Sequence, residues 1–134
     1  MKKFELTSEF VTFLGEKLFR IKALVSFGDV AEGELGGFIK KENNLDQSGN
    51  AWVYGDAWVQ CCRDYSAASC FGSKNRTTTF FRTKDDGIGV RCGCFYGTLE
   101  EFREKVKERH GDSRLAKEYL TLADAMEFRL SKDE

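Results

Sequence analysis

The sequence predicts a single α+β domain, in which an N-terminal antiparallel β-sheet is followed by a C-terminal helical hairpin packed on that sheet. Three observations predict this fold class. Residues 18–25 and 76–95 carry strand patterns, residues 49–60 contain a six-residue repeat, and residues 98–130 place apolar side chains at helical spacing. A chain of 134 residues suits one domain and leaves no room for a second of full size.

The domain divides into three consecutive regions without a linker, because proline is absent and no glycine/serine-rich or like-charge stretch interrupts the chain. Residues 1–46 are expected to form N-terminal strands and turns. Residues 47–96 hold a vestigial hexapeptide strip, like a piece of a left-handed β-helix, and a β-hairpin. Residues 97–131 are expected to form two C-terminal helices.

Charge and composition exclude several kinds of partner. The 21 lysines and arginines nearly cancel the 22 aspartates and glutamates, so no net field attracts a nucleic-acid polymer or a membrane surface. The sequence shows neither a secretion signal nor a membrane-spanning run. The five cysteines form an odd set that suits reduced core residues better than disulfides. We therefore expect a cytoplasmic protein, in the host cytosol if it is phage-encoded.

The first region contains one clear strand, at residues 18–25, whose alternating pattern indicates that one side is buried. The apolar side is formed by Phe19, Ile21, Ala23 and Val25, and the polar side by Arg20 and Lys22. The glycines between residues 28 and 37 then predict short turns. They do not precede a helix, so a phosphate-binding loop is not expected there.

The repeat begins with Gly-Asn-Ala-Trp-Val-Tyr at residues 49–54, followed directly by Gly-Asp-Ala-Trp-Val-Gln at residues 55–60. Two less regular units extend it to about residue 71. A six-residue period is typical of the left-handed β-helix, but four units make barely one coil. Because so few repeats cannot bury one another's faces, the strip must pack against the rest of the domain. Trp52 and Trp58 hold equivalent positions in the repeat, where packing or a subunit interface is favoured over ligand stacking.

A β-hairpin is predicted at residues 76–95, with its turn at Asp85-Asp86-Gly87. In the first strand, alternation places Arg76, Thr78, Phe80 and Arg82 on one face. In the second strand, Arg91 lies opposite the apolar face of Ile88, Val90, Cys92 and Cys94. If the basic faces of the two strands coincide, one side of the sheet presents three arginines, a threonine and aromatic rings.

Two amphipathic helices are predicted after the hairpin. Thr98 and Glu101 form a capping box, Gly111 ends the first helix, and Asp112 or Ser113 caps the second. Their apolar stripes consist of Leu99, Phe102 and Val106 in the first helix and Leu115, Tyr119, Leu122, Met126 and Leu130 in the second.

The candidate ligand-binding residues are those of the basic hairpin face together with the turn between the helices. They are Arg76, Thr78, Phe80, Arg82, Arg91 and Arg114. Arginine offers paired donors to phosphate, threonine adds neutral donors, and a ring gives a base a surface for stacking. The alternative is that these hairpin residues form an ordinary solvent-exposed face of the sheet and bind no ligand. At the second helix, an open N-terminus beside Arg114 and Lys117 could receive an anion.

Catalytic, metal and cofactor sites are not predicted. The single histidine, His110, ends the first helix without a recognisable catalytic partner, so a helix-end role is favoured over a general base. The cysteines Cys61, Cys62, Cys70, Cys92 and Cys94 lack the usual zinc spacing. Core packing is favoured for them, with zinc as the alternative.

The sequence also resembles known proteins at these residues. Arg20–Leu24, Phe27–Val30, Leu35–Ile39 and Gly49–Val59 resemble hexapeptide-type proteins of phages and bacteria, often labelled transferase-like, and Phe80–Leu130 resembles a C-terminal module of phage and prophage proteins. The layout of a sheet followed by two helices is similar to the first family of Thoeris anti-defence proteins. That resemblance implies a sponge that sequesters cyclic ADP-ribose-type immune signals and, in some members, cyclic oligonucleotides. No residue's role is carried over from it.

Binding is therefore favoured over catalysis. The first hypothesis is a homo-oligomeric, cytoplasmic sponge that holds a small cyclic nucleotide without turnover. The second is a structural or protein-binding oligomerisation module, and the third is an acyltransferase-like enzyme. In the first two, assembly through the exposed end of the short coil is expected, because that end leaves backbone groups and apolar side chains uncovered.

Overall fold

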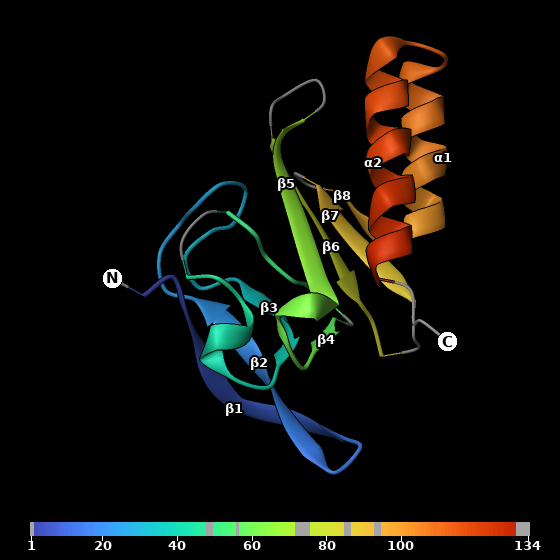
Figure 1. The fold of residues 1–134 in the computed structure, drawn as a ribbon. Helices are drawn as coiled ribbons and strands as arrows, with labels where there is room; N and C mark the ends of the chain where they lie inside the picture. Colours follow the sequence, from blue (N-terminus) through green and yellow to red (C-terminus); the bar gives the residue numbers. More distant parts are fainter. Residues whose placement is uncertain are drawn as a thin grey trace.

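A computed structural model describes residues 2–47, 50–55, 57–71, 76–84, 87–92 and 95–130. The fold is α+β, as predicted, with strands that precede a helical hairpin packed on a sheet. The strands form two four-stranded sheets instead of one, in the orders β1-β2-β3-β4 and β5-β6-β7-β8. Figure 1 shows the second sheet as a middle layer, between the helices and the first sheet.

The bounds of the elements follow the chain from one sheet to the next. The first sheet contains β1 (Phe4–Phe13), β2 (Glu16–Ala23), β3 (Leu35–Ile39) and β4 (Trp58–Val59). The second contains β5 (Tyr65–Phe71), β6 (Arg76–Arg82), β7 (Ile88–Cys92) and β8 (Phe95–Thr98). The helices are α1 (Leu99–His110) and α2 (Arg114–Leu130), and short 3₁₀ turns lie at Glu42–Asn44 and Cys62–Asp64.

In the first sheet, β1, β2 and β3 pair antiparallel, and β4 is parallel to β3. The predicted strand at residues 18–25 corresponds to β2, which ends at Ala23. Ile21 and Ala23 are buried as expected, in a core cluster with Phe4, Ile39 and Val59. This cluster also includes Phe81 of the second sheet, so the two sheets share one apolar core.

The glycines at residues 36 and 37 lie in a strand, β3, so the prediction that they form turns is wrong. Their lack of a side chain lets the repeat segment pack directly on β3. The N–H of Gly37 donates to the carbonyl of Val53 at 2.9 Å, and the N–H of Lys40 donates to the carbonyl of Val59 at 3.0 Å. Val53 and Val59, six residues apart, are both fully buried. The repeat therefore contributes side chains at its six-residue period to the core of the first sheet.

The predicted hairpin is confirmed by the antiparallel pairing of β6 with β7. The two faces of this sheet meet different layers, because alternate residues point to opposite sides. Phe80 and Val90 belong to the cluster that packs under the helices, whereas Phe81 belongs to the first sheet's cluster. Both faces of β6 are thus covered, which explains its apolar and β-branched sequence.

The two helices begin and end where the sequence predicts. The Thr98 hydroxyl accepts a hydrogen bond from the N–H of Glu101 at 3.1 Å, and the Glu101 carboxylate accepts one from the N–H of Thr98 at 2.8 Å. Gly111 follows α1 with a φ of 57°, a conformation that favours glycine. The Ser113 hydroxyl accepts from the N–H of Ala116 at 3.3 Å, so Ser113 caps α2.

Candidate functional site

Two of the predicted ligand-binding residues lie in the core. Thr78 and Phe80 are both fully buried. The Phe80 ring meets the Phe102 ring of α1 edge to face, with 5.8 Å between centroids. The Thr78 hydroxyl donates to the sulfur of Cys92 at 3.2 Å. The helices therefore cover the face that was expected to be open and basic.

The strand register separates the predicted arginines. Arg91 pairs with Thr79, whereas Phe80 pairs with Val90, so Arg91 lies on the face opposite Phe80. The basic faces of the two strands do not coincide. Arg82 pairs with Ile88 near the end of β6, and its guanidinium lies 3.4 Å from the Asp64 carboxylate.

The remaining two arginines lie elsewhere. Arg114 is exposed at the first residue of α2, after the turn between the helices. Arg76 begins β6, but its side chain lies outside the described part of the structure, as do residues 72–75.

The most elaborate polar cluster among the described residues surrounds Arg91. Its guanidinium forms an ion pair with Glu34, which directly precedes β3, and donates to the carbonyl of Asp29 at 3.2 Å. The guanidinium carbon also lies 4.8 Å from the centroid of the Tyr54 ring. A cation over an aromatic face is attracted by the ring's quadrupole. We call Arg91, Glu34, Tyr54 and Tyr96 the Arg91 cluster.

Tyr96 gives this cluster its exposed surface. Its ring meets Tyr54 edge to face at 4.9 Å and stacks against Phe81 at 6.3 Å, yet 41% of the residue remains exposed. Gly55 allows this approach, because a Cβ at that position would lie 2.2 Å from the Tyr96 hydroxyl. The cluster therefore places an arginine, a carboxylate and two phenol rings at the junction of the two sheets.

Sequence reasoning identified only Arg91 in this cluster. Glu34 and Tyr54 come from other parts of the chain, and no local pattern marks them as partners of Arg91. Tyr54 ends the first repeat unit, but its counterpart in the next unit is Gln60, so the repeat did not single it out. The register of β7 and β8 pairs Arg91 with Tyr96. Tertiary contacts with distant segments then bring Glu34 and Tyr54 to this pair.

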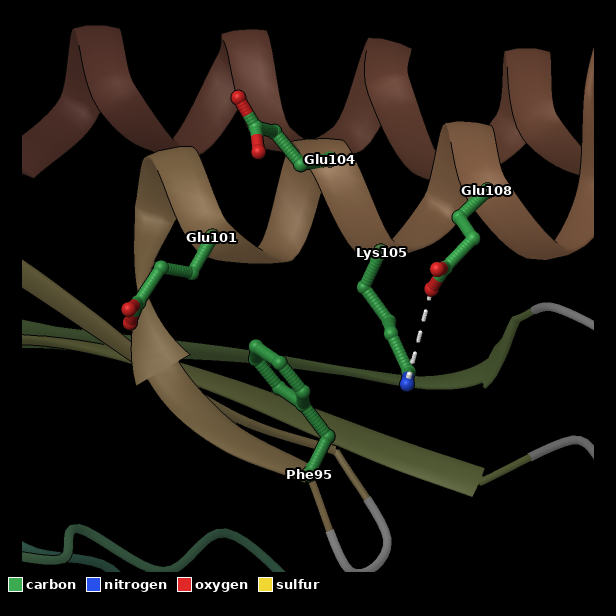
Figure 2. Close-up of a pocket in the computed structure, with 5 residues that line it drawn as sticks. All are labelled: Phe95, Glu101, Glu104, Lys105 and Glu108. Atoms are coloured by element: carbon green, nitrogen blue, oxygen red, sulfur yellow. Dashed lines mark ion pairs between the residues drawn. The ribbon is translucent and has the colours of Figure 1, made fainter.

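A separate hollow of about 340 Å³ lies beside α1 and β8. It is lined by Phe95, Glu101, Glu104, Lys105 and Glu108. Figure 2 shows Lys105 and Glu108 directed toward each other near the Phe95 ring, with their charged atoms 3.8 Å apart. Three carboxylates and one ammonium make the hollow acidic, so it repels a phosphate.

A buried lysine lies in the first sheet's core. The Lys3 ammonium donates to the carbonyl of Ala51 at 2.9 Å and lies 4.8 Å from the centroid of the Phe27 ring. Burial lowers the pKa of Lys3 to about 8, and the nearby charge of Asp46 acts in the opposite direction. Because these contacts hold the amine inside the domain, we assign it to the core and not to the candidate site.

The two tryptophans and the single histidine pack against other aromatic rings. Trp52 is buried between Phe4 and Phe27, and Trp58 packs edge to face on Phe13. The His110 ring stacks on Tyr119 at 5.7 Å. Of the cysteines, Cys94 and the side chains of Cys62 and Cys70 lie outside the described residues.

Two features are absent from the described residues. No group of three or more histidine, cysteine, aspartate or glutamate side chains there could hold a metal ion. Neither described helix combines the length and the apolar character needed to cross a membrane.

The fold and this cluster define an α+β protein with a polar and aromatic site at the junction of two sheets. Comparison with known protein families, with curated proteins and with solved structures gives no significant match for the chain.

Proposed function

We propose that the protein binds a small cyclic nucleotide of the cyclic ADP-ribose kind and holds it without turnover, at the Arg91 cluster. The observation that supports this proposal is the Arg91 guanidinium resting on Tyr54, beside the partly exposed ring of Tyr96. A nucleotide needs charge-assisted donors for its phosphates and a ring surface for its base. The resemblance in layout to anti-defence sponges favours the same class of ligand, an immune signal in the host cytosol.

Glu34 has a specific part in this proposal. Its carboxylate is bound to the Arg91 guanidinium, in the position that a ligand phosphate would take. Glu34 closes a turn in which its own N–H donates to the carbonyl of Ala31 at 3.0 Å. An incoming phosphate would displace this carboxylate or share the Arg91 guanidinium with it. Glu34 therefore competes with the ligand for Arg91.

Calorimetry with a panel of cyclic ADP-ribose isomers and cyclic oligonucleotides tests the proposal. Arg91→Ala should weaken binding about ten- to a hundredfold, through the loss of a charge-assisted contact of about 1.5–3 kcal/mol. Glu34→Gln should strengthen binding, because the competing charge is removed. Arg20→Ala is the matched control: Arg20 also forms an ion pair, with Glu9 at 3.1 Å, and lies 4.5 Å from the Phe38 ring, away from the cluster.

Two results would contradict the proposal in different ways. If no member of the panel binds at micromolar concentration, the structural or protein-binding module is favoured over the sponge. If a ligand binds and folded Arg91→Ala binds it equally well, the site moves from this cluster, with Arg114 at the interhelical turn as the next candidate.

A further inference from the structure

The segment that joins β2 to β3 is tied to the second sheet by Arg91. Residues 24–34 lie between these two strands, and Figure 1 shows them as a loop beyond the end of β2. The Arg91 guanidinium, which comes from β7, contacts this segment at two points, the Glu34 carboxylate and the carbonyl of Asp29. We call residues 24–34 the strap, because Arg91 holds them across the junction of the sheets.

The strap has hydrogen bonds of its own, which allow it to move as one body. Phe27 and Val30 exchange two backbone hydrogen bonds, at 3.0 and 2.8 Å. The Ser26 hydroxyl accepts a hydrogen bond from the N–H of Glu32 at 3.0 Å. None of these bonds involves Arg91, so they remain when the strap leaves the second sheet.

The strap covers part of the first sheet's core with the Phe27 ring. This ring packs edge to face on Trp52, with 5.5 Å between centroids, and lies 4.8 Å from the Lys3 ammonium. Trp52 and Lys3 are both buried, as is Val30 of the strap. Most other strap positions between the sheets' strands are exposed, namely Ser26, Gly28, Asp29, Ala31, Glu32 and Gly33. A segment that buries so little surface is of the kind that opens locally while the rest of a domain stays folded.

Arg91 couples the position of the strap to the proposed ligand. In the closed strap, the Glu34 carboxylate is paired with the guanidinium that a ligand phosphate would bind. Two anions at one guanidinium repel each other, so the ligand binds better when Glu34 has moved away. A ligand that binds one of two states better shifts the population toward that state. Binding at Arg91 therefore favours the open strap.

We propose that Arg91 holds the strap closed through Glu34 and the Asp29 carbonyl, and that a phosphate which binds Arg91 opens it. The identity of the ligand rests on the proposed function, whereas the closing contacts do not. Opening lifts the Phe27 ring and uncovers Trp52 and the Lys3 amine. The ligand-bound protein then presents a different surface from the free protein, at a part of the first sheet that the ligand does not touch.

Hydrogen exchange of the full chain, read by mass spectrometry, measures the closing contacts without any ligand. Arg91→Ala should speed the exchange of the strap amides about ten- to a hundredfold, because a charge-assisted contact is lost. Glu34→Gln should speed it by a smaller factor, since this change removes the charge but keeps the oxygen that accepts from the N–H of Ala31 at 3.3 Å. Arg103→Ala is the matched control: Arg103 also forms an ion pair, 2.7 Å from Asp124, but this pair joins the two helices.

Inorganic pyrophosphate tests the opening step, because it carries the linked phosphates of a nucleotide without the base. In millimolar pyrophosphate, the strap amides of the wild type should exchange faster. The Lys3 amine should also be acetylated faster, relative to the exposed amine of Lys2 in the same chain. Arg91→Ala should show no further increase on addition of pyrophosphate.

The inference is overturned if Arg91→Ala leaves the strap exchange unchanged, or if pyrophosphate leaves the wild-type strap closed. It is also overturned if exchange in Arg91→Ala rises equally at Gly37, whose N–H bonds to the repeat segment away from the strap, because the whole domain then loosens. The proposed function fails on a different result, the absence of binding by every cyclic nucleotide of the panel, and the variants and pyrophosphate still decide the strap. A cyclic nucleotide that binds through Arg91 while the strap stays closed supports the proposed function and overturns this inference.

Discussion

Gly37 of β3 and Ala57 of the repeat segment are in such close contact that a Cβ on Gly37 would lie 2.6 Å from the Cβ of Ala57. The N–H of Phe38 donates to the carbonyl of Ala57 at 2.8 Å and holds the two segments at this distance. Glycine at this position is required by packing, because its side of the strand has no space for a methyl group.

Gly37→Ala should therefore destabilise the domain by about 1–3 kcal/mol, the usual cost of overpacking a core. Urea denaturation of the purified variant measures this change. Ala57→Gly introduced into the same chain removes the methyl group that causes the closest clash, and it should recover part of the loss. A Gly37→Ala variant as stable as the wild type would show that β3 and the repeat segment are not packed this closely.

Phe80→Ala should destabilise the domain by about 3–5 kcal/mol, because it removes a buried ring that packs on Phe102. Thermal melting should show a large fall in Tm. Phe128→Ala removes a ring that is almost fully exposed, and its Tm should stay close to that of the wild type. If Phe80→Ala melts like the wild type and loses only ligand affinity, the ring belongs to a binding site and not to the core.

The sequence predicts best those features that depend on neighbours in the chain. The cap at Thr98, the end of α1 at Gly111 and the β6–β7 hairpin all follow from local patterns, and all three are confirmed. β1 was not predicted as a separate strand, because the register shift between Leu6 and Phe10 breaks the alternation that marks a strand.

The candidate site could be predicted only in part, because it depends on contacts between distant segments. Arg91 was identified by its residue type, but its partner Glu34 is 57 residues away in the sequence. Phe80 has the same chemistry as a stacking ring on a surface. Only the helices that cover β6 place it in the core, and the sequence does not say which face of a strand a helix will cover.

Lys3 should make the domain more stable as the pH rises from about 8 toward 10.5. The folded-state pKa of about 8 is below the ordinary lysine value of 10.5. In this range the unfolded chain binds a proton that the folded chain does not, so raising the pH favours the folded state, by at most about 3 kcal/mol. Below pH 8 both states are protonated and this contribution is constant.

Denaturation of Lys3→Met at a series of pH values separates this effect from other titrating groups. The difference in unfolding free energy between wild type and variant should change between pH 8 and 10.5 and level off outside that range. Lys2→Met is the control, because the Lys2 ammonium is exposed and pairs with Glu42 at the surface. A difference that stays constant across the range for Lys3→Met would show that this amine is not buried in the folded protein.

The Arg91–Glu34 pair should stabilise the junction between the sheets more than an exposed ion pair does. Its side chains are 14% and 21% exposed, against 57% and 40% for Lys2 and Glu42. A double-mutant cycle of Arg91→Ala and Glu34→Gln should give a coupling free energy of about 1–3 kcal/mol, since either single change leaves a partly buried group without its partner. The corresponding cycle for Lys2 and Glu42 should give less than about 1 kcal/mol.

In about 0.5 M NaCl the surface coupling should nearly vanish while most of the Arg91–Glu34 coupling remains, because partly buried charges are screened less. Equal loss of both couplings in salt would mean that Arg91 and Glu34 meet in solvent, and that the junction holds them less closely than the structure shows.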